Sequence, residues 1–279
     1  MEKRLFVTDL DGTLLNAKKE IPPFTVRTIQ KIIENGDYFT IASARTPATV
    51  VPMLAEIPVN APAVLMNGVI LFDLKKRSAL KVEYIPDHAA LKVVQAFEKH
   101  RRYGFLYHYS RDAIEVHYRN LNSLCEQEFY TIRKGKAYKK FVQTENFYPL
   151  IDGNVVYFAV IGSYEELEPL SKSIADIPEI DFVFYKDVYA QDVYYLEIYS
   201  VKANKENGVR NLKRFVSCGR TIAFGDNYND MEMFRCADEC YAVENGVPEL
   251  QQMANGIIPS NEEEGVAHKL MEFLTESSH

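Results

Sequence analysis

The sequence predicts an α/β protein in which a doubly wound parallel sheet is interrupted by an inserted α+β domain. Short apolar runs alternate with helical segments in the first and last parts of the chain. Polar or small residues follow each run, so the strand ends should share one sheet edge, where such sheets place their sites. Between residues 84 and 199 the composition shifts toward Tyr, Phe and strand-forming runs. We therefore assign residues 1–83 and 200–279 to a core domain and residues 84–199 to an insert.

The overall composition is that of a soluble globular protein with a mild negative charge. The chain has 279 residues, enough for one large or two moderate domains, and a formal net charge of -7. This charge argues against a general binder of nucleic acids or membrane surfaces. The start lacks the apolar region of a signal peptide, and no uncharged window could span a membrane. Four cysteines are too few for a disulfide scaffold, so we expect a cytoplasmic protein with Cys236 and Cys240 as buried thiols rather than zinc ligands.

The first strand is predicted within residues 4–15, where an apolar run ends in two closely spaced carboxylates. Asp9 and Asp11 would point to the same side of an extended segment, followed by Gly12 and the hydroxyl of Thr13. Two like charges this close are costly unless a cation or a shared proton relieves them. An Asp-Gly hairpin turn is the alternative. We favour a phosphate or metal site because no matching alternating strand follows.

The next elements continue the alternation of strands and helices. Pro22-Pro23 opens a helix whose apolar residues recur at helical spacing, and Gly36 follows at the C-cap position. The remaining predicted elements of this part are a strand at 38–42 ending in Ser43-Ala44-Arg45, a helix from Thr46-Pro47 to Ile57-Pro58, and a strand at 63–66 ending in Asn67-Gly68.

The alternation of strands and helices stops after residue 68. Residues 69–83 read as a hairpin with polar residues at its bend, and several aromatic strands follow. Helices are predicted near residues 87–100, 121–131 and 164–176, and the second of these lacks a clean apolar face.

The parallel-sheet pattern returns after residue 200. The predicted elements are a helix at 205–215, a strand at 221–224, a helix from Met231, a strand at 240–243, a helix at 247–254, an extended piece at 256–259 and a closing helix at 265–274. The two ends of the chain therefore build one domain between them.

A second acidic cluster lies where the strand at 221–224 ends. Asp226, Asn229 and Asp230 lead into a helix there, although Asp and Asn are also common caps and turn formers. Together with Asp9 and Asp11 on the same sheet edge, they form a plausible magnesium site. Ser43 and Arg45 would supply a hydroxyl and a planar cation for phosphate oxygens, although each alone is more often a cap or a surface residue.

These motifs, taken together, resemble the haloacid dehalogenase-like phosphatase superfamily, specifically its Cof-type branch, subfamily IIB. The matching segments, in order, are Asp9-Leu10-Asp11-Gly12-Thr13, Ser43-Ala44-Arg45, Asn67-Gly68, Lys205 eight residues after Glu197, and Gly225-Asp226 through Asn229-Asp230 to Met233. The resemblance implies a Rossmann-like core, and the insert sits where this branch carries its C2B-type cap domain.

The sequence departs from the family pattern at two places. Ser43-Ala44-Arg45 stands where the family often has Thr-Gly-Arg, which keeps the hydroxyl and the cation. Glu206 stands where a glycine usually follows the lysine, and the hinge at residues 200–204 lacks the usual Pro or Gly. We therefore expect the chemistry to be intact and the hinge geometry to differ.

The resemblance implies a magnesium-dependent phosphomonoester hydrolase that acts on small phosphorylated metabolites, most expectedly sugar phosphates, through an aspartyl-phosphate. An acid at Asp11 favours phosphoryl transfer over carbon-halogen cleavage. The implied roles are nucleophile for Asp9, acid and base for Asp11, Mg²⁺ binding by Asp9, Asp11 and Asp226, phosphate binding by Leu10, Ser43, Ala44, Arg45, Lys205 and Asn229, and support by Thr13, Asn67, Gly68 and Asp230.

Two other functions stay open at this point. A phosphomutase would use the same residues and pass the phosphoryl group to a sugar hydroxyl, and a non-catalytic sensor would only bind a phosphorylated ligand. The expected partner is a small phosphomonoester, with no nucleic acid and no membrane, and the chain is expected to be a monomer or weak homodimer. Specificity should come from the insert, where no single residue is favoured among Tyr107, His108, Tyr109, Arg111, His117, Arg119, Arg133 and Tyr185.

Overall fold

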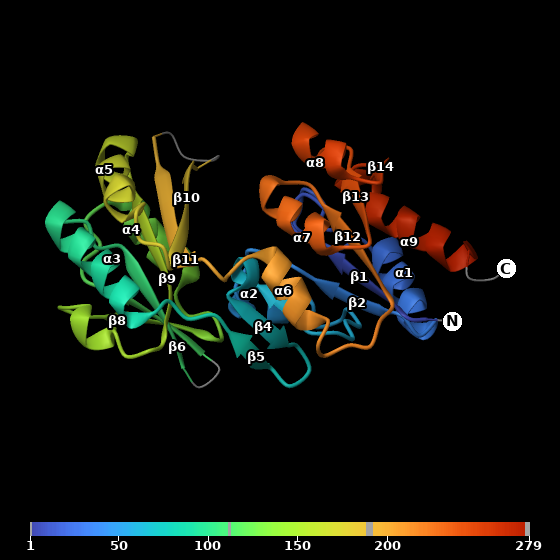
Figure 1. The fold of residues 1–279 in the computed structure, drawn as a ribbon, viewed down its shortest axis with the longest axis horizontal. Helices are drawn as coiled ribbons and strands as arrows, with labels where there is room; N and C mark the ends of the chain where they lie inside the picture. The colour runs from blue at the N-terminus through green and yellow to red at the C-terminus, as the bar shows by residue number, and fades with distance from the viewer. Residues whose placement is uncertain (1, 111–112, 188–191, 277–279) are drawn as a thin grey trace. The chain divides into compact units, whose positions relative to one another are not determined.

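The structure, a computed structural model, describes residues 2–110, 113–187 and 192–276 (Figure 1). Arg111, one of the insert residues named above, lies outside the described residues. The chain forms two compact units. We call residues 2–81 with 204–276 the core unit and residues 82–203 the inserted unit.

The core unit is built on a five-stranded sheet in which every pair of neighbours is parallel. In sheet order the strands are β14 (Gly256–Ile258), β13 (Glu239–Val243), β12 (Arg220–Gly225), β1 (Arg4–Thr8) and β2 (Tyr38–Ile41). The chain moves outward from β1 to β2 and returns on the other side of β1 as β12. This confirms the predicted doubly wound sheet, and ligands bind such sheets where the strand order reverses.

Helices cover both faces of this sheet. On one face α1 (Pro23–Glu34) lies beside α9 (Gly265–Glu276), and Phe6 of β1 meets Phe273 of α9 with ring centroids 5.4 Å apart (Figure 1). On the other face Leu5 and Val7 enter a buried cluster with residues of three helices. These are α6 (Lys205–Leu212), α7 (Met231–Cys236) and α8 (Pro248–Met253). A further helix, α2 (Pro47–Met53), follows β2.

The predicted hairpin is present, but the strand before it pairs differently from the prediction. β3 (Ala63–Leu65), β4 (Ile70–Asp73) and β5 (Ser78–Val82) form a separate small sheet, in which β3 pairs with β4 antiparallel. β3 touches the main sheet through a single bridge between Ala42 and Val64. Met66 and Asn67 adopt positive φ angles of 53° and 52°, so the chain reverses after three residues and the strand is too short to extend the parallel sheet.

The inserted unit is a six-stranded sheet with helices. In sheet order its strands are β10 (Ile180–Lys186), β11 (Tyr194–Ser200), β9 (Val155–Gly162), β6 (Phe105–Ser110), β7 (Ala113–Tyr118) and β8 (Lys139–Gln143). Neighbours are antiparallel except β7 and β8, which are parallel and joined through α4 (Leu124–Arg133). α3 (Asp87–His100) and α5 (Tyr164–Ile174) pack together against one face of this sheet (Figure 1).

Short 3-10 helices complete the fold: η1 (Met66–Gly68), η2 (Tyr148–Leu150), η3 (Tyr228–Asp230) and η4 (Asn261–Glu263). The four cysteines are free thiols, with Cys240 buried and Cys236 half-buried. Among the described residues, no helix has both the length and the hydropathy that crossing a bilayer requires.

Candidate active site

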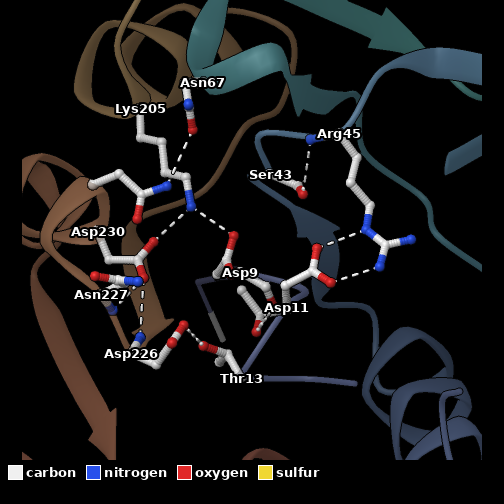
Figure 2. Close-up of polar contacts among 12 residues, drawn as sticks. Asp9, Asp11, Thr13, Ser43, Arg45, Asn67, Lys205, Asp226, Asn227 and Asp230 are labelled. Carbon is white, nitrogen blue, oxygen red and sulfur yellow. Dashed lines mark hydrogen bonds and ion pairs between the residues drawn. The ribbon is translucent and has the colours of Figure 1, made fainter. Parts of the chain in front are cut away.

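Two neighbouring strands of the core sheet end in carboxylates that lie side by side. β1 ends at Thr8, so Asp9 follows directly, and β12 ends at Gly225, so Asp226 follows. The parallel register continues one step past the strands, since the Asp9 backbone N–H donates to the Phe224 carbonyl at 3.0 Å. The strand ends therefore bring together side chains that are more than 200 residues apart in the chain (Figure 2).

A buried lysine joins two of the carboxylates. Lys205 Nζ donates to Asp9 Oδ1 at 2.6 Å and to Asp230 Oδ1 at 2.7 Å (Figure 2). Lys205 and Asp230 are completely buried and Asp9 is 6% exposed. Lys205 is the first residue of α6, whose N-cap Asn204 accepts a hydrogen bond from the Asn207 backbone N–H at 2.7 Å.

Asp230 acts as a support within this group. Its Oδ2 accepts hydrogen bonds from the backbone N–H groups of Asp226 and Asn227, at 2.9 and 3.0 Å. With Lys205 on Oδ1, both oxygens are engaged. The side chain thus fixes the turn that follows β12 and also the position of Lys205.

The carboxylates of Asp9, Asp226 and Asp230 carry more negative charge than the single positive charge of Lys205 can neutralise. Burial raises the pKa of Asp9 to about 8, against the opposing charge of Lys205. Burial and then the charge of Asp230 raise the pKa of Asp226 to about 6. Although burial acts in the opposite direction, Asp230 and Asp9 hold the pKa of Lys205 above its ordinary value. A further cation would relieve this excess.

The geometry fits a small hard cation. Oxygens of Asp9, Asp226 and Asp230 all lie within 4.8 Å of one another. Within the described residues, Asp9 Oδ2 and Asp226 Oδ2 accept no hydrogen bond, so each retains a ligand atom. Carboxylate oxygens are the ligands that Mg²⁺ prefers, with water completing its shell. Asp9 and Asp226 are therefore the side chains best placed to hold it.

The loop after β1 is shaped around Asp226. Thr13 Oγ1 donates to Asp226 Oδ1 at 2.8 Å (Figure 2). Gly12 has a φ of +81°, and a Cβ at this position would lie 2.4 Å from Asp226 Oδ2. A glycine is therefore required here both by the backbone conformation and by the close carboxylate.

Asp11 lies outside the buried cluster and forms an ion pair with Arg45. Arg45 Nε and Nη2 donate to the two Asp11 oxygens, both at 2.6 Å, and the Asp11 side chain is 52% exposed (Figure 2). Such bidentate pairing fixes the plane of the carboxylate. The guanidinium that was predicted to bind phosphate thus contacts the predicted acid instead, and its phosphate role stays a prediction.

The remaining predicted residues border the same sheet edge. Ser43 is buried, and its Oγ accepts from the Arg45 backbone N–H at 3.2 Å. Asn67 donates its backbone N–H to the Ser43 carbonyl at 3.0 Å, and Asn229 Nδ2 donates to Asn67 Oδ1 at 3.1 Å. Gly68 has a φ of +97° and lets the Asn204 carbonyl approach to within 2.2 Å of where a Cβ would be.

Two of the predicted phosphate-binding residues contribute no polar side chain. The Leu10 side chain is fully buried, whereas Ala44 is exposed. Any contact of theirs with phosphate would come from the backbone.

Asn245 lies at this sheet edge but was not predicted from the sequence. Its Nδ2 donates to the Gly12 carbonyl at 2.8 Å and so ties the loop after β13 to the loop after β1. The signal was present, because the buried strand at 240–243 also ends in a polar stretch, Glu244-Asn245-Gly246.

Comparison with known proteins places these features in a family. A family model described as haloacid dehalogenase-like hydrolase matches residues 6–270. A 5-amino-6-(5-phospho-D-ribitylamino)uracil phosphatase of Bacillus subtilis is 26% identical over 275 residues, covering 97% of both chains. A pyridoxal phosphate phosphatase of Escherichia coli is 22% identical over 97% of this chain and 100% of its own.

Solved structures share the fold. TM0651 from Thermotoga maritima superimposes with a TM-score of 0.77 at 23% identity, covering 97% of each chain. The HAD subclass IIB sugar phosphatase BT4131 superimposes with a TM-score of 0.73 at 19% identity, covering 97% of this chain and 98% of that one.

Proposed function

The chain belongs to the haloacid dehalogenase-like hydrolases, in their Cof-type branch of phosphatases, and we propose that it hydrolyses small phosphomonoesters with Mg²⁺ through an aspartyl-phosphate. Sugar phosphates are the substrates we propose first. The inserted unit is proposed to act as the cap, and the free thiols support a cytoplasmic setting.

Asp9 is the proposed nucleophile. One of its oxygens is held by Lys205 at 2.6 Å, which limits the rotation of the carboxylate. An oxygen of Asp9 attacks phosphorus while the bond from phosphorus to the leaving oxygen breaks. The phosphoryl group is then carried by Asp9, and Lys205 offsets part of the added negative charge.

Asp11 is the proposed acid and base. It gives a proton to the leaving oxygen in the first step and takes one from the attacking water in the second, when the bond between Asp9 and phosphorus breaks. Its exposure and its position outside the buried cluster support this role, since an acid must reach both the leaving group and water. Arg45 sets the direction of its carboxylate before substrate arrives.

Asp9 and Asp226 would hold Mg²⁺, with the Asp11 backbone carbonyl as a further proposed ligand and Asp230 and Thr13 orienting the carboxylates. When bound, the ion would neutralise the charge that otherwise repels an anionic nucleophile from an anionic substrate. Ser43 and Lys205 are the proposed partners of the phosphoryl oxygens, whose charge the site must stabilise.

The observation that carries the proposal is the buried triad of Asp9, Lys205 and Asp230 beside Asp226. The test is phosphate release from a panel of phosphomonoesters, including an aryl phosphate, by wild-type protein and by Asp9→Asn in the presence of Mg²⁺. Wild type should turn over. Asp9→Asn should lose about 10³-fold or more in kcat while keeping its circular dichroism spectrum and melting temperature.

Turnover by Asp9→Asn at the wild-type rate would remove Asp9 from the mechanism. A folded wild-type protein that releases phosphate from no member of the panel would overturn the proposed function.

A further inference from the structure

The loop after β13 contacts two loops of the candidate site. β13 pairs in parallel with β12, with Ala242 opposite Gly225, so both strands end at the same edge of the core sheet. We call residues 244–247, which lead from β13 into α8, the β13 loop. It forms hydrogen bonds with the backbone of the loop that carries Asp11 and with the backbone of Asp226.

The contact with the loop after β1 is made by a side-chain amide. Asn245 Nδ2 donates to the Gly12 carbonyl at 2.8 Å, and Asn245 Oδ1 accepts from the Asn261 backbone N–H at 3.0 Å. A carbonyl can only accept a hydrogen bond and a backbone N–H can only donate one, so these two partners determine which way the amide points. An apolar or acidic side chain of the same size could not make both bonds.

The contact with the loop after β12 is made by the backbone. The Val247 N–H donates to the Asp226 carbonyl at 2.8 Å. At the preceding residue, Gly246, a Cβ would lie 3.0 Å from the same carbonyl oxygen, which is closer than ordinary van der Waals contact. The glycine therefore lets the β13 loop lie directly against Asp226.

The β13 loop is held in shape by a side chain of α8. Gln251 Nε2 donates to the carbonyls of Val243, Glu244 and Gly246, at 3.2, 2.9 and 3.2 Å. The Gly246 N–H also closes a turn on the Val243 carbonyl at 2.9 Å. These bonds satisfy backbone groups that would otherwise face water, so the loop can act as a firm support for its neighbours.

Two further contacts hold the later part of the loop after β1. Asn261 Nδ2 donates to the Leu15 carbonyl at 2.7 Å, and the Ala17 N–H donates to Glu262 Oε1 at 2.6 Å. Both partners belong to η4. Because these bonds lie further along the loop than Gly12, they can support its end without fixing its beginning.

We propose that the β13 loop is a positioning element of the candidate site, which sets the spacing between Asp226 and the loop that carries Asp11. Asn245 holds one backbone and Val247 holds the other. The Asp11 carbonyl and the Asp226 carboxylate are proposed ligands of Mg²⁺, and this ion demands near-ideal geometry of its ligands. The inference rests on the proposed function and adds Asn245 and Gln251 as residues that act through the groups they hold.

The first test measures metal binding without turnover. Mn²⁺ serves as the probe, because it suits the same oxygen ligands and the free ion can be counted by electron paramagnetic resonance. Asp226→Asn identifies the binding that belongs to this site. Asn245→Ala and Asn245→Leu should each weaken that binding roughly tenfold, as expected when a residue that orients a metal ligand is lost. Asn245→Leu keeps the size of the side chain, so wild-type binding by this variant would overturn the role of the hydrogen bonds.

Asn35→Ala is the matched control for the asparagine variants. Asn35 is also an exposed asparagine of the core unit, and its Nδ2 donates to Asp37 Oδ2 at 3.1 Å. Asp37 precedes β2, so this bond lies at the opposite edge of the sheet from the strand ends. The control should change Mn²⁺ binding by less than about twofold, with a small shift in melting temperature like that of Asn245→Ala.

Gln251→Leu tests whether the β13 loop works as a unit. The Gln251 amide bonds to carbonyls of this loop and of the end of β13, so we expect it to act on the metal site through the loop. Gln251→Leu should weaken Mn²⁺ binding about threefold, and the double variant with Asn245→Ala should lose less than the product of the two single losses. Losses that multiply in full would show that Gln251 does not act through Asn245.

Kinetics with an aryl phosphate separate this inference from the proposed function. At saturating Mg²⁺, Asn245→Ala should lower kcat roughly tenfold and change KM by less than about twofold. Wild-type protein that binds Mn²⁺ but releases no phosphate would overturn the proposed function, and weaker Mn²⁺ binding by Asn245→Ala would still support the positioning role. Phosphate release and Mn²⁺ binding that are both unchanged in Asn245→Ala would overturn the positioning role alone. Wild-type protein that binds no Mn²⁺ would overturn both.

Discussion

Lys205 is the cation that pairs with the buried carboxylates of the core unit. Its side chain is fully buried and contacts two carboxylates, Asp9 and Asp230, at 2.6 and 2.7 Å. Buried charges are tolerated only when they are paired and hydrogen-bonded. Removing the lysine would leave two buried carboxylates facing each other, together with Asp226.

Lys205→Met is therefore predicted to destabilise the core unit as well as to remove activity. Breaking a buried ion pair from one side costs about 3–5 kcal/mol. Urea unfolding should show this loss, and Lys18→Met, which changes an exposed lysine, should stay within about 0.5 kcal/mol of wild type. If Lys205→Met were as stable to urea as wild type, Lys205 would not contribute to the stability of the core unit.

The anion that Arg45 binds cannot be predicted from the sequence motif. The motif identifies a cation after the Ser43 strand end, but two anions compete for it: the substrate phosphate and Asp11. In the structure Arg45 binds Asp11 through two bonds of 2.6 Å. The distance between side chains 34 residues apart depends on how the two loops fold, which no local pattern encodes.

At the scale of elements, strand ends and the turns after them build the candidate site. β1 and β12 deliver Asp9 and Asp226, and the N-terminus of α6 delivers Lys205. Close approaches at glycines allow these elements to meet, since Gly12 lies against the Asp226 carboxylate and Gly68 lies against the Asn204 carbonyl.

Gly12→Ala is predicted to impair catalysis through the loop. The new Cβ would fall 2.4 Å from Asp226 Oδ2 and must displace that carboxylate. A shift of this kind at the proposed metal ligand should cost about 10²-fold in kcat/KM. Gly36→Ala is the matched control, because Gly36 also has a positive φ, +93°, but its Cβ would have no neighbour within 4 Å.

Both glycine variants should lose about 1 kcal/mol of stability in urea unfolding, because alanine is strained at a positive φ. Only Gly12→Ala should also lose turnover. Equal turnover in the two variants would show that Asp226 tolerates displacement.

Across the whole molecule, the elements were predictable to a greater extent than their pairing. The parallel core, its helices and the acidic strand ends followed from periodicity and from residues such as Pro23 and Gly36 that mark helix ends. The antiparallel pairing of β3 was not predictable, because it depends on the positive φ angle of Met66, a residue that rarely adopts this conformation.

The acidic cluster predicts a pH-dependent stability that Mg²⁺ should change. The pKa of Asp9 is raised to about 8 in the folded chain and that of Asp226 to about 6, against an ordinary value of 3.8. The folded state therefore keeps protons that the unfolded state has lost, so metal-free protein should lose stability as pH rises from about 4 to about 8. The proposed Mg²⁺ would bind the ionised carboxylates, so it should stabilise the protein more at pH 8 than at pH 5.

Melting temperatures in EDTA and in Mg²⁺ across this pH range check the prediction. Asp226→Asn should reduce the Mg²⁺ effect, whereas Asp176→Asn, at an exposed position of the inserted unit, should leave it unchanged. If metal-free protein gained stability as the pH rises over this range, the acidic cluster would not hold the excess negative charge that we infer.

The most direct test of the central claim is to trap the phosphoryl group on Asp9. Asp11→Asn lacks the proposed base that activates water, and an aryl phosphate needs little help from an acid to leave. With 4-nitrophenyl phosphate and Mg²⁺, this variant should release a rapid burst of nitrophenol equal to the enzyme concentration. Mass spectrometry of the acid-quenched protein should then find one phosphoryl group on the peptide that contains Asp9. Steady turnover with no burst and no phosphoryl group on that peptide would contradict the account.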